Sequence, residues 1–324
     1  MSAAAAPVPA LPADAAERLA AFERALDPAR PTAQAGVELL GWGEVSAVLG
    51  VPALPGWVCK RMAGFRDEPA AERYLDVVRR YVETLTGDGV RVVETRLVPL
   101  RVPRRRPVVY LLQPRLDPAR LGHQLLRTVP DAVLAACLER ALDVVLRVHR
   151  ANRGRPGGRT LGIDGQLSNW YFPPGPAVGD PALLDVGTPF MRLHGRDELD
   201  VELFLAAVPP VARAWYRRQR AVERYLDDYF TPRRVLVDLL GNFHKEGRAD
   251  RVPFAAACAN RWLAAHAAEL DDARPVEVDA IARYYARDAA QLELFLRARR
   301  LDRWLRTRLL RQRYDFVLPG PIRR

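Results

Sequence analysis

Three polar residues near the middle of the sequence have types and a spacing that could hold a metal ion and move a proton. Asp164 and Asn169 stand five positions apart in a loop that leads into an apolar run at 170–172. Asp185 follows a second apolar run at 182–184 and precedes Val-Gly. A β-hairpin formed by the two runs would bring the three side chains to one end. One carboxylate could then deprotonate a hydroxyl group, while the other carboxylate and the amide bind Mg²⁺ through oxygen.

A pair of glycines could bring backbone N–H groups against a phosphate. Gly41 and Gly43 lie between two β-prone runs, in the stretch Leu-Gly-Trp-Gly-Glu-Val-Ser. A residue without a Cβ lets the backbone approach an anion closely. The same two glycines also fit an ordinary hairpin turn, so they indicate a phosphate site only together with other features.

Lys60 is one of only two lysines in a chain with 50 basic residues. It ends the strand-like pattern Trp-Val-Cys-Lys, and an inward-facing lysine on a strand needs a carboxylate or phosphate partner. The helix that we expect at 68–86 offers several carboxylates. We favour Glu72 as the partner, with Asp76 as the second choice. The alternative is a lysine at the end of a strand that points to water.

The elements that position these residues change in character along the chain. After an Ala/Pro-rich start and a helix at 14–27, short β-prone runs and one helix occupy the segment up to 116, which predicts an antiparallel sheet packed on that helix. From Pro118 onward the pattern is mainly helical, apart from strands and loops at 161–190. The expected strands are 37–40, 45–49, 57–62, 90–100 and 107–112. The expected helices of the second part are 131–150, 198–207, 210–229, 231–243, 253–269, 275–287 and 288–313.

Taken in order, these motifs resemble the protein-kinase-like superfamily, and most closely its bacterial aminoglycoside and choline phosphotransferase branch. The shared pattern is a Gly-rich hairpin, a strand lysine, a helix glutamate, Asp-x-x-x-x-Asn and Asp-x-Gly, spread over residues 36–190. The resemblance implies an α+β, two-lobed fold. A tail and leading helix would occupy 1–35, an N-lobe with an antiparallel sheet and one helix 36–116, and a helical C-lobe 117–324.

The resemblance also implies how a nucleotide is bound. Gly41 and Gly43 would cover the phosphates of ATP. Lys60 would contact the α- and β-phosphates, and Glu72 would orient Lys60. Gln113, which follows the last β-prone run, corresponds to the hinge between the lobes, where adenine stacks.

The catalytic and metal-binding roles follow from the same resemblance. Asp164 would be the catalytic base, acting with Lys60, and Asn169 and Asp185 would bind Mg²⁺. Two departures from the family stand out: Gly-Ile precedes Asp164 where the small-molecule branch has His-Gly, and no Ala-Pro-Glu motif follows. The second departure argues against a protein kinase with a regulated activation loop.

The charge of the chain is compatible with several partners. The sequence of 324 residues has 50 basic and 39 acidic side chains, a net charge of +11, which suits nucleic acid, anionic lipid or a phosphorylated substrate. Nearly all the basic residues are arginine, as expected from a GC-rich genome. We therefore attribute much of the charge to solvated faces and do not expect a nucleic-acid partner. The arginine-dense helix at 288–313 is interpreted as a packing helix with a basic outer face.

Composition limits the class of protein further. With 49% hydrophobic residues the chain can bury a core, and charges interrupt every apolar stretch before about 18 residues, so we expect no membrane span. Cys59, Cys137 and Cys258 are scattered, which indicates neither a disulfide framework nor a metal cluster. The N-terminus has no basic flank before an apolar run, so no signal peptide is expected. The reducing cytoplasm is the expected location.

Three functions remain open at this point. The favoured one is an ATP- and Mg²⁺-dependent phosphotransferase acting on a hydroxyl of a small molecule, because every charged residue that this chemistry needs is present. The second is a nucleotide-binding pseudokinase that acts as a scaffold or regulator. The third is a basic adaptor for nucleic acid or a membrane surface.

Overall fold

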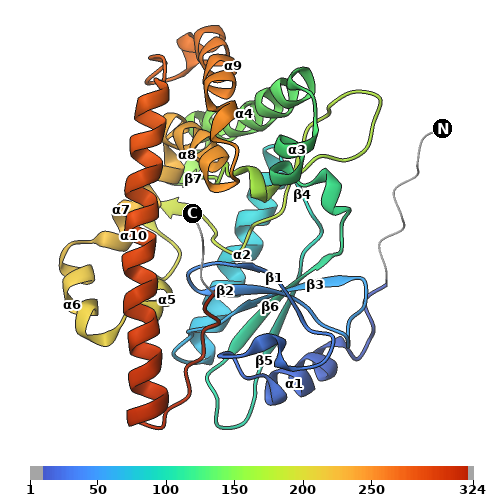
Figure 1. The fold of residues 1–324 in the computed structure, drawn as a ribbon, viewed down its shortest axis with the longest axis vertical. Helices are drawn as coiled ribbons and strands as arrows, with labels where there is room; N and C mark the ends of the chain where they lie inside the picture. The colour runs from blue at the N-terminus through green and yellow to red at the C-terminus, as the bar shows by residue number, and fades with distance from the viewer. Residues whose placement is uncertain (1–9, 320–324) are drawn as a thin grey trace.

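The main sheet is built from the β-prone first part of the sequence. In the computed structural model, which describes residues 10–319, five antiparallel strands lie in the spatial order β1-β2-β3-β6-β5 (Figure 1). The expected strand at 90–100 is wrong in one respect: it is two strands, because its start joins a different sheet. The strands of the main sheet are β1 (Glu38–Trp42), β2 (Ser46–Gly50), β3 (Trp57–Met62), β5 (Arg96–Leu100) and β6 (Val108–Pro114).

The two faces of this sheet pack on different helices. Alternate side chains of a strand point to opposite faces, so on β6 Tyr110 and Leu112 join the core around α1 (Ala15–Ala25). Val109 joins the larger core, which contains α2 (Glu68–Gly87) and the helices of the second part of the chain. The sheet is therefore covered on both faces, and the buried residues of β6 are divided between the two cores.

Helix α2 begins and ends at strong local signals. The Asp67 carboxylate accepts a hydrogen bond from Ala70 N at 2.8 Å, which caps the helix N-terminus. After Gly87 the chain turns through Gly89, whose φ of +78° favours glycine. The expected helix at 68–86 is confirmed to within one residue.

The second part of the chain is helical, as expected, with two differences in continuity. The expected helices at 275–287 and 288–313 are one helix, α10, because no glycine or proline interrupts residues 278–304. The expected helix at 210–229 is divided at Arg220, whose φ is +47°. The helices are α3 (Gly122–Thr128), α4 (Asp131–Gly154), α5 (Glu202–Ala207), α6 (Pro210–Arg218), α7 (Ala221–Asp227), α8 (Pro232–Lys245), α9 (Val252–Ala265) and α10 (Val278–Trp304).

Short strands connect the two parts. β8 pairs with β9 in an antiparallel hairpin, so the hairpin expected from the apolar runs at 170–172 and 182–184 is confirmed. β9 also pairs in parallel with β4, which ties the segment after α2 to this hairpin. The short strands are β4 (Arg91–Val92), β7 (Arg159–Leu161), β8 (Trp170–Tyr171), β9 (Ala182–Leu183), β10 (Met191–Leu193) and β11 (Arg196–Asp197).

Several compositional expectations can be compared with this structure. All three cysteines are free and buried, as the scattered positions predicted. Among residues 10–319 no helix has the length and apolarity that crossing a bilayer requires. The Ala/Pro-rich start was expected as a tail, and its residues 1–9 lie outside the described residues.

A buried ion pair joins α1 to the centre of the sheet. The Arg61 guanidinium on β3 donates two hydrogen bonds of 2.8 Å to the Glu23 carboxylate, and both side chains are at least 98% buried. Tyr110 Oη donates a third bond to Glu23 at 2.7 Å. Although burial raises the pKa of Glu23, the bonds and charge of Arg61 hold it below its ordinary value.

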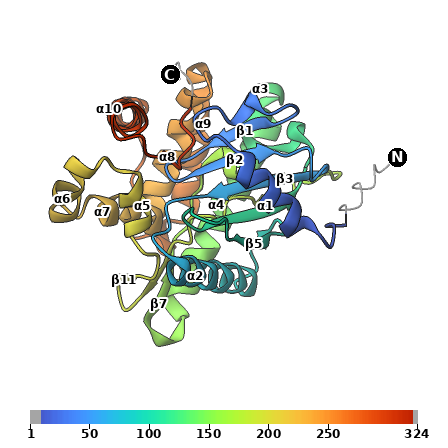
Figure 2. The same cartoon turned by 90° about the horizontal axis from the view of Figure 1, so that it is seen from below.

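The C-terminal segment returns to the sheet after α10. Figure 1 shows α10 along one side of the molecule, and Figure 2 shows it end-on beside the other helices. Arg299 on α10 is fully buried and donates to the carbonyl of Glu44 in the β1–β2 turn at 2.6 Å. Beyond the helix, Val317 O accepts a bond from Trp42 Nε1 at 2.8 Å. The second part of the chain thus holds the tip of the first hairpin.

We predict that Glu23→Gln lowers the free energy of unfolding by about 3 kcal/mol or more, because it leaves the Arg61 charge buried without its partner. Urea unfolding followed by circular dichroism measures the change. Arg79→Ala, which breaks an exposed pair with Asp76, should cost no more than about 1 kcal/mol. Equal losses in the two variants would contradict a structural role for the buried pair.

Candidate active site

Lys60 and Asp185 form an ion pair at the boundary between the sheet and the helical part. Lys60 lies on β3 between β2 and β6, where its partners across the sheet are Val48 and Leu111. Its Nζ lies 2.5 Å from Asp185 Oδ1, directly after β9. The Lys60 side chain is 17% exposed and the Asp185 side chain 31%, so the pair is partly buried.

Gly187 contacts both members of this ion pair, and a side chain at its position would collide with Lys60. Its N–H donates to Asp185 Oδ1 at 2.8 Å, and a Cβ at this position would lie only 2.9 Å from Lys60 Nζ. Burial alone would raise the pKa of Asp185, but Lys60 and the Gly187 N–H together hold it below its ordinary value. Asp185 is therefore an anion. Its Oδ1 accepts both of these hydrogen bonds, and its other oxygen, Oδ2, accepts neither.

The Asp164 segment is held by backbone and aromatic contacts. Ile163 N donates to Tyr229 O at 3.0 Å, and Gly162 O accepts from the Tyr81 hydroxyl of α2 at 2.9 Å. A Cβ on Gly162 would lie 2.7 Å from Tyr229 O, so only glycine fits this approach. Asp164 Oδ1 in turn accepts from Gln166 N at 3.0 Å. The carboxylate therefore has a defined position.

Asp164 shares its surroundings with a second carboxylate, Asp238 on α8. Burial raises the pKa of Asp164 to about 7, and the negative charge of Asp238 adds to this rise. The pKa of Asp238 is raised too, first by its own burial, while hydrogen bonds from Gln166 and Tyr284 oppose the rise. One carboxylate of this pair thus changes charge near neutral pH, as a general base requires.

Asn169 lies beside Asp185 because of the β8–β9 hairpin. Leu184 N, one residue before Asp185, donates to Asn169 O at 2.8 Å. The side chain of Asn169 is 8% exposed, and its buried amide nitrogen has no hydrogen-bond partner within the described residues. The hairpin therefore brings Asn169 and Asp185 to one end, as the sequence predicted.

The donor set fits a cation that is held only partly by protein. Within residues 10–319 no three His, Cys, Asp or Glu side chains gather closely enough to hold a metal ion. Mg²⁺ usually has one or two carboxylate ligands and completes its shell with water and substrate phosphates. The second oxygen of Asp185 and the orphaned amide group of Asn169 suit such a partial site, and the amide would have to turn its oxygen toward the ion.

The predicted nucleotide-contacting residues lie around the same region. Gly41 lies at an irregular step of the β1–β2 pairing, and Gly43 N donates to Ser46 O at 3.1 Å, closing the turn. The Gln113 side chain donates to Thr95 Oγ1 at 2.9 Å and to Leu184 O at 2.6 Å. Its amide NH₂ is used to join β6 to the segment that ends at Asp185.

The expected pairing of Lys60 with Glu72 is wrong. The Glu72 side chain is 65% exposed, and the cation near it is Arg101, at 3.7 Å. At about 100° per residue, Glu72 falls almost opposite Tyr74, which points inward and donates its hydroxyl to Gly187 O at 2.8 Å. Asp76, the second choice, pairs with Arg79 on the outer face. Asp185 takes the place that we expected a helix carboxylate to fill.

The sequence analysis missed Asp238 and assigned no role to Gln166. Lys245 Nζ lies 3.2 Å from Gln166 Oε1, and its charge lowers the pKa of both Asp164 and Asp238. One signal was available: Asp238 is the lone charge in the apolar run Val-Leu-Val-Asp-Leu-Leu on α8. A lone carboxylate inside an apolar helix run indicates a buried polar contact.

Most of the chain matches one protein family. The model of a family of unknown function (DUF6206) matches residues 28–303, and a search of curated proteins finds no match. Among solved structures the chain is similar to WaaP in complex with acyl carrier protein, at 14% identity and a TM-score of 0.31, covering 75% of this chain and 90% of that one. It is also similar to the GDP complex of wild-type aminoglycoside 2′-phosphotransferase-IIIa, at 13% identity and a TM-score of 0.34, covering 75% and 94%. At these TM-scores we draw no conclusion from either structure.

We predict that Lys60→Met destabilises the protein by about 1–2 kcal/mol at pH 7, because Asp185 then lacks its cation. The loss should shrink as the pH falls. The low pKa of Asp185 contributes stability that is present above its unfolded value and is lost on protonation. Urea unfolding at pH 7 and at about pH 3, which lies below the ordinary aspartate pKa of about 3.9, measures both. Glu72→Gln should change stability at neither pH, and a Lys60→Met loss that is independent of pH would contradict the ion pair.

Proposed function

The chain belongs to the DUF6206 family, and we propose that it is a phosphotransferase that transfers phosphate from Mg²⁺-bound ATP to a hydroxyl of a small molecule. The observation that carries this proposal is the placement of Asn169 and Asp185 at one end of the β8–β9 hairpin, with Lys60 bonded to Asp185 and with Asp164 near enough for the charge of Asp185 to raise its pKa. A proton acceptor, a metal-ligand pair and a phosphate-binding cation are the groups that phosphoryl transfer needs.

Asp164 is the proposed catalytic base. Its carboxylate is fixed by Gln166 N, and its raised pKa makes it a stronger proton acceptor than an ordinary aspartate. In the reaction it would accept the proton of the acceptor hydroxyl while that oxygen bonds to the γ-phosphorus of ATP and the bond from this phosphorus to the bridging oxygen breaks, releasing ADP. Asp238, Gln166 and Lys245 would set the charge and orientation of Asp164 without contacting the reacting atoms.

Lys60, Asn169 and Asp185 are proposed to bind the donor. The Lys60 ammonium, now on Asp185, would bind phosphate oxygens, with the Gly41–Gly43 turn above them. Asn169 and Asp185 would be the protein ligands of Mg²⁺. When bound, the ion would neutralise charge on the phosphate oxygens. Gln113 would mark the adenine end of the site, where β6 leaves the sheet.

The same proposal includes a two-lobed arrangement. The sheet with α1 and α2 would form the nucleotide-binding lobe, at 36–116 with the leading segment 1–35. Residues 117–324 would form the helical lobe that supplies the catalytic and metal-binding loops. The Lys60–Asp185 pair and the Gln113–Leu184 bond, which join the two, support this division.

One observation favours a second candidate, a nucleotide-binding scaffold without turnover. Among the described residues no carboxylate of α2 forms an ion pair with Lys60, whose partner there is Asp185. A binding assay and an assay of turnover separate the two candidates. Stabilisation by ATP and Mg²⁺ without ATP consumption, in the presence of a panel of hydroxyl acceptors, would favour the scaffold. Absence of nucleotide binding would overturn both.

We predict that Asp164→Asn leaves Mg²⁺-dependent ATP affinity near that of the wild type while lowering turnover by about 10²-fold or more, since it removes only the base. Asp185→Asn should weaken both, because it removes an anionic metal ligand. Thermal-shift titration with ATP and Mg²⁺ measures affinity, and ATP consumption measures turnover. If Asp164→Asn and wild type have the same turnover, Asp164 is not the base.

The pH profile gives an independent test of the Asp164 environment. Because the pKa of Asp164 is raised to about 7, its carboxylate form, and with it the rate, should increase as the pH rises through 7. Asp238→Asn removes the neighbouring negative charge, so the rise should move to lower pH by roughly one unit. Asp76→Asn, on the outer face of α2, is the control and should not move it. An unshifted profile in Asp238→Asn would contradict the proposed coupling.

A further inference from the structure

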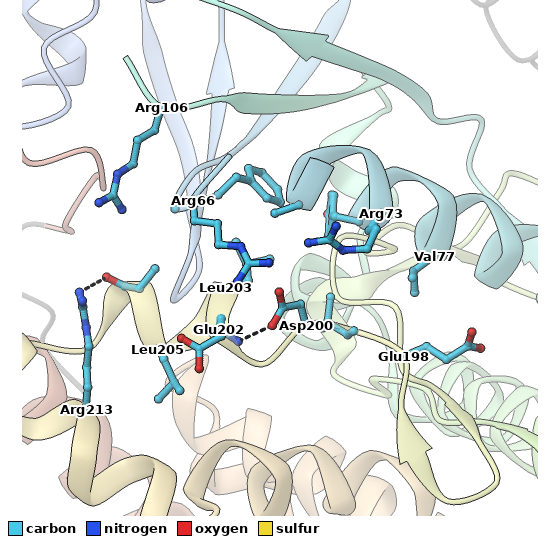
Figure 3. Close-up of a pocket in the computed structure, with 16 residues that line it drawn as sticks. Arg66, Arg73, Val77, Arg106, Glu198, Asp200, Glu202, Leu203, Leu205 and Arg213 are labelled. Carbon is cyan, nitrogen blue, oxygen red and sulfur yellow. Dashed lines mark hydrogen bonds between the residues drawn. The ribbon is translucent and has the colours of Figure 1, made fainter. Parts of the chain in front are cut away.

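A cavity of about 240 Å³ lies apart from the catalytic cluster. Three segments enclose it: the residues that follow β3, the first half of α2, and the segment 198–206 with α5. Arg106 enters from the β5–β6 loop and Arg213 from α6. Figure 3 shows these two arginines at the left of the view, one above the other, with Arg66 and then Arg73 to their right. None of the residues that we assign to catalysis or metal binding lines it.

The positive charge in this cavity is not balanced. In the described part of the chain no carboxylate pairs with Arg73 or Arg106. Arg213 donates only to backbone, to Val208 O at 2.9 Å and Ala206 O at 3.1 Å. Burial, together with nearby arginines that include Arg306 and Arg106, lowers the pKa of Arg213. Like charges thus gather around it, and the negative charge of Asp302 opposes their effect on its pKa.

The carboxylates of the lining are mostly engaged elsewhere. Glu198 pairs at 2.5 Å with Arg80, and Glu202 accepts two hydrogen bonds from Arg217. Arg80 and Arg217 do not line the cavity. Asp200 accepts the N–H of Glu202, as Figure 3 shows. The lining therefore has three arginines without carboxylate partners and only one carboxylate without an arginine partner.

The cavity also has an apolar side. Phe65 and Leu203 are at least 95% buried and line it together with Val77 and Leu205. Arginine forks suit the oxygens of a phosphate, and the apolar side suits a small hydrocarbon or aromatic body. The volume lies slightly below the usual range of about 300–1,000 Å³ for drug-sized ligands, so the ligand would be small.

We propose that this cavity is a second binding site, for a small phosphate monoester whose phosphate is attracted by the lining arginines Arg73, Arg106 and Arg213 and whose apolar body lies against Phe65 and Leu203. The site is independent of the proposed phosphotransferase activity. It neighbours that active site, because Tyr74 lines the cavity and donates its hydroxyl to Gly187 O. The test must therefore separate the two sites.

Phenyl phosphate is the probe, titrated by isothermal calorimetry at an ionic strength held constant with sodium chloride. We expect saturable binding to the wild type and no binding of benzyl alcohol. Arg73→Gln and Arg106→Gln should each weaken binding about tenfold or more, the effect of one lost charge-assisted contact. Neither side chain holds the fold through an ion pair, so both variants should unfold at the wild-type temperature.

Two control variants make the result specific. Arg79→Gln removes an exposed arginine from the outer face of the same helix and should bind phenyl phosphate as the wild type does. Lys60→Met should retain this binding while losing ATP. No binding to the wild type, equal losses in Arg79→Gln and Arg73→Gln, or loss only in Lys60→Met would each overturn the proposal. The last outcome would assign the phosphate to the active site.

Discussion

The pleat of β3 is the constraint on which the rest of the structure depends. Lys60 and Arg61 are adjacent in sequence, so they must point to opposite faces of the sheet. Each therefore needs its own carboxylate in its own core, Asp185 on one face and Glu23 on the other. A shift of the β3 register by one residue would move Lys60 to the face of Glu23 and Arg61 to the face of Asp185, so neither observed ion pair could form. Structural stability and the arrangement of the active site are thus set by the same strand.

The opposite faces of β3 serve different purposes. The Arg61–Glu23 pair is buried and bidentate, and the Tyr110 hydroxyl donates a further bond to Glu23. Solvent hardly reaches this pair, so its role is to hold α1 against the sheet. The Lys60–Asp185 pair is partly exposed and uses one carboxylate oxygen for both of its bonds. The ammonium of Lys60 can leave Asp185 for the anionic group of a ligand. Such an exchange of partners is typical of a binding site and not of a hydrophobic core.

Local signals in the sequence predicted much of this arrangement. β3 has the expected bounds because turns precede and follow it, and α2 begins at its Asp-Glu-Pro signal. The β8–β9 hairpin was visible as two apolar runs, and it brings Asn169 and the residue before Asp185 together. The prediction that Glu72 pairs with Lys60 was wrong, and the sequence alone could have excluded it. Glu72 and the inward-facing Tyr74 are two residues apart on a helix, so their side chains point about 200° apart. Asp238 could not be assigned, because Gln166 and Tyr284, its partners, come from remote segments.

The bonds from the C-terminal segment have a consequence for the order of folding. Arg61 donates to Asp315 O, Arg299 to Glu44 O and Trp42 to Val317 O, across 254, 255 and 275 residues of sequence. During synthesis on the ribosome the first hairpin and β3 emerge long before these partners do. Contacts of such separation form late and slow the approach to the native state. The sheet can pair its strands early, but the turn that carries Gly43 becomes fixed only when α10 and residues 313–318 have been made. A nascent chain would therefore hold an incomplete β1–β2 turn until residues 299–318 have been synthesised.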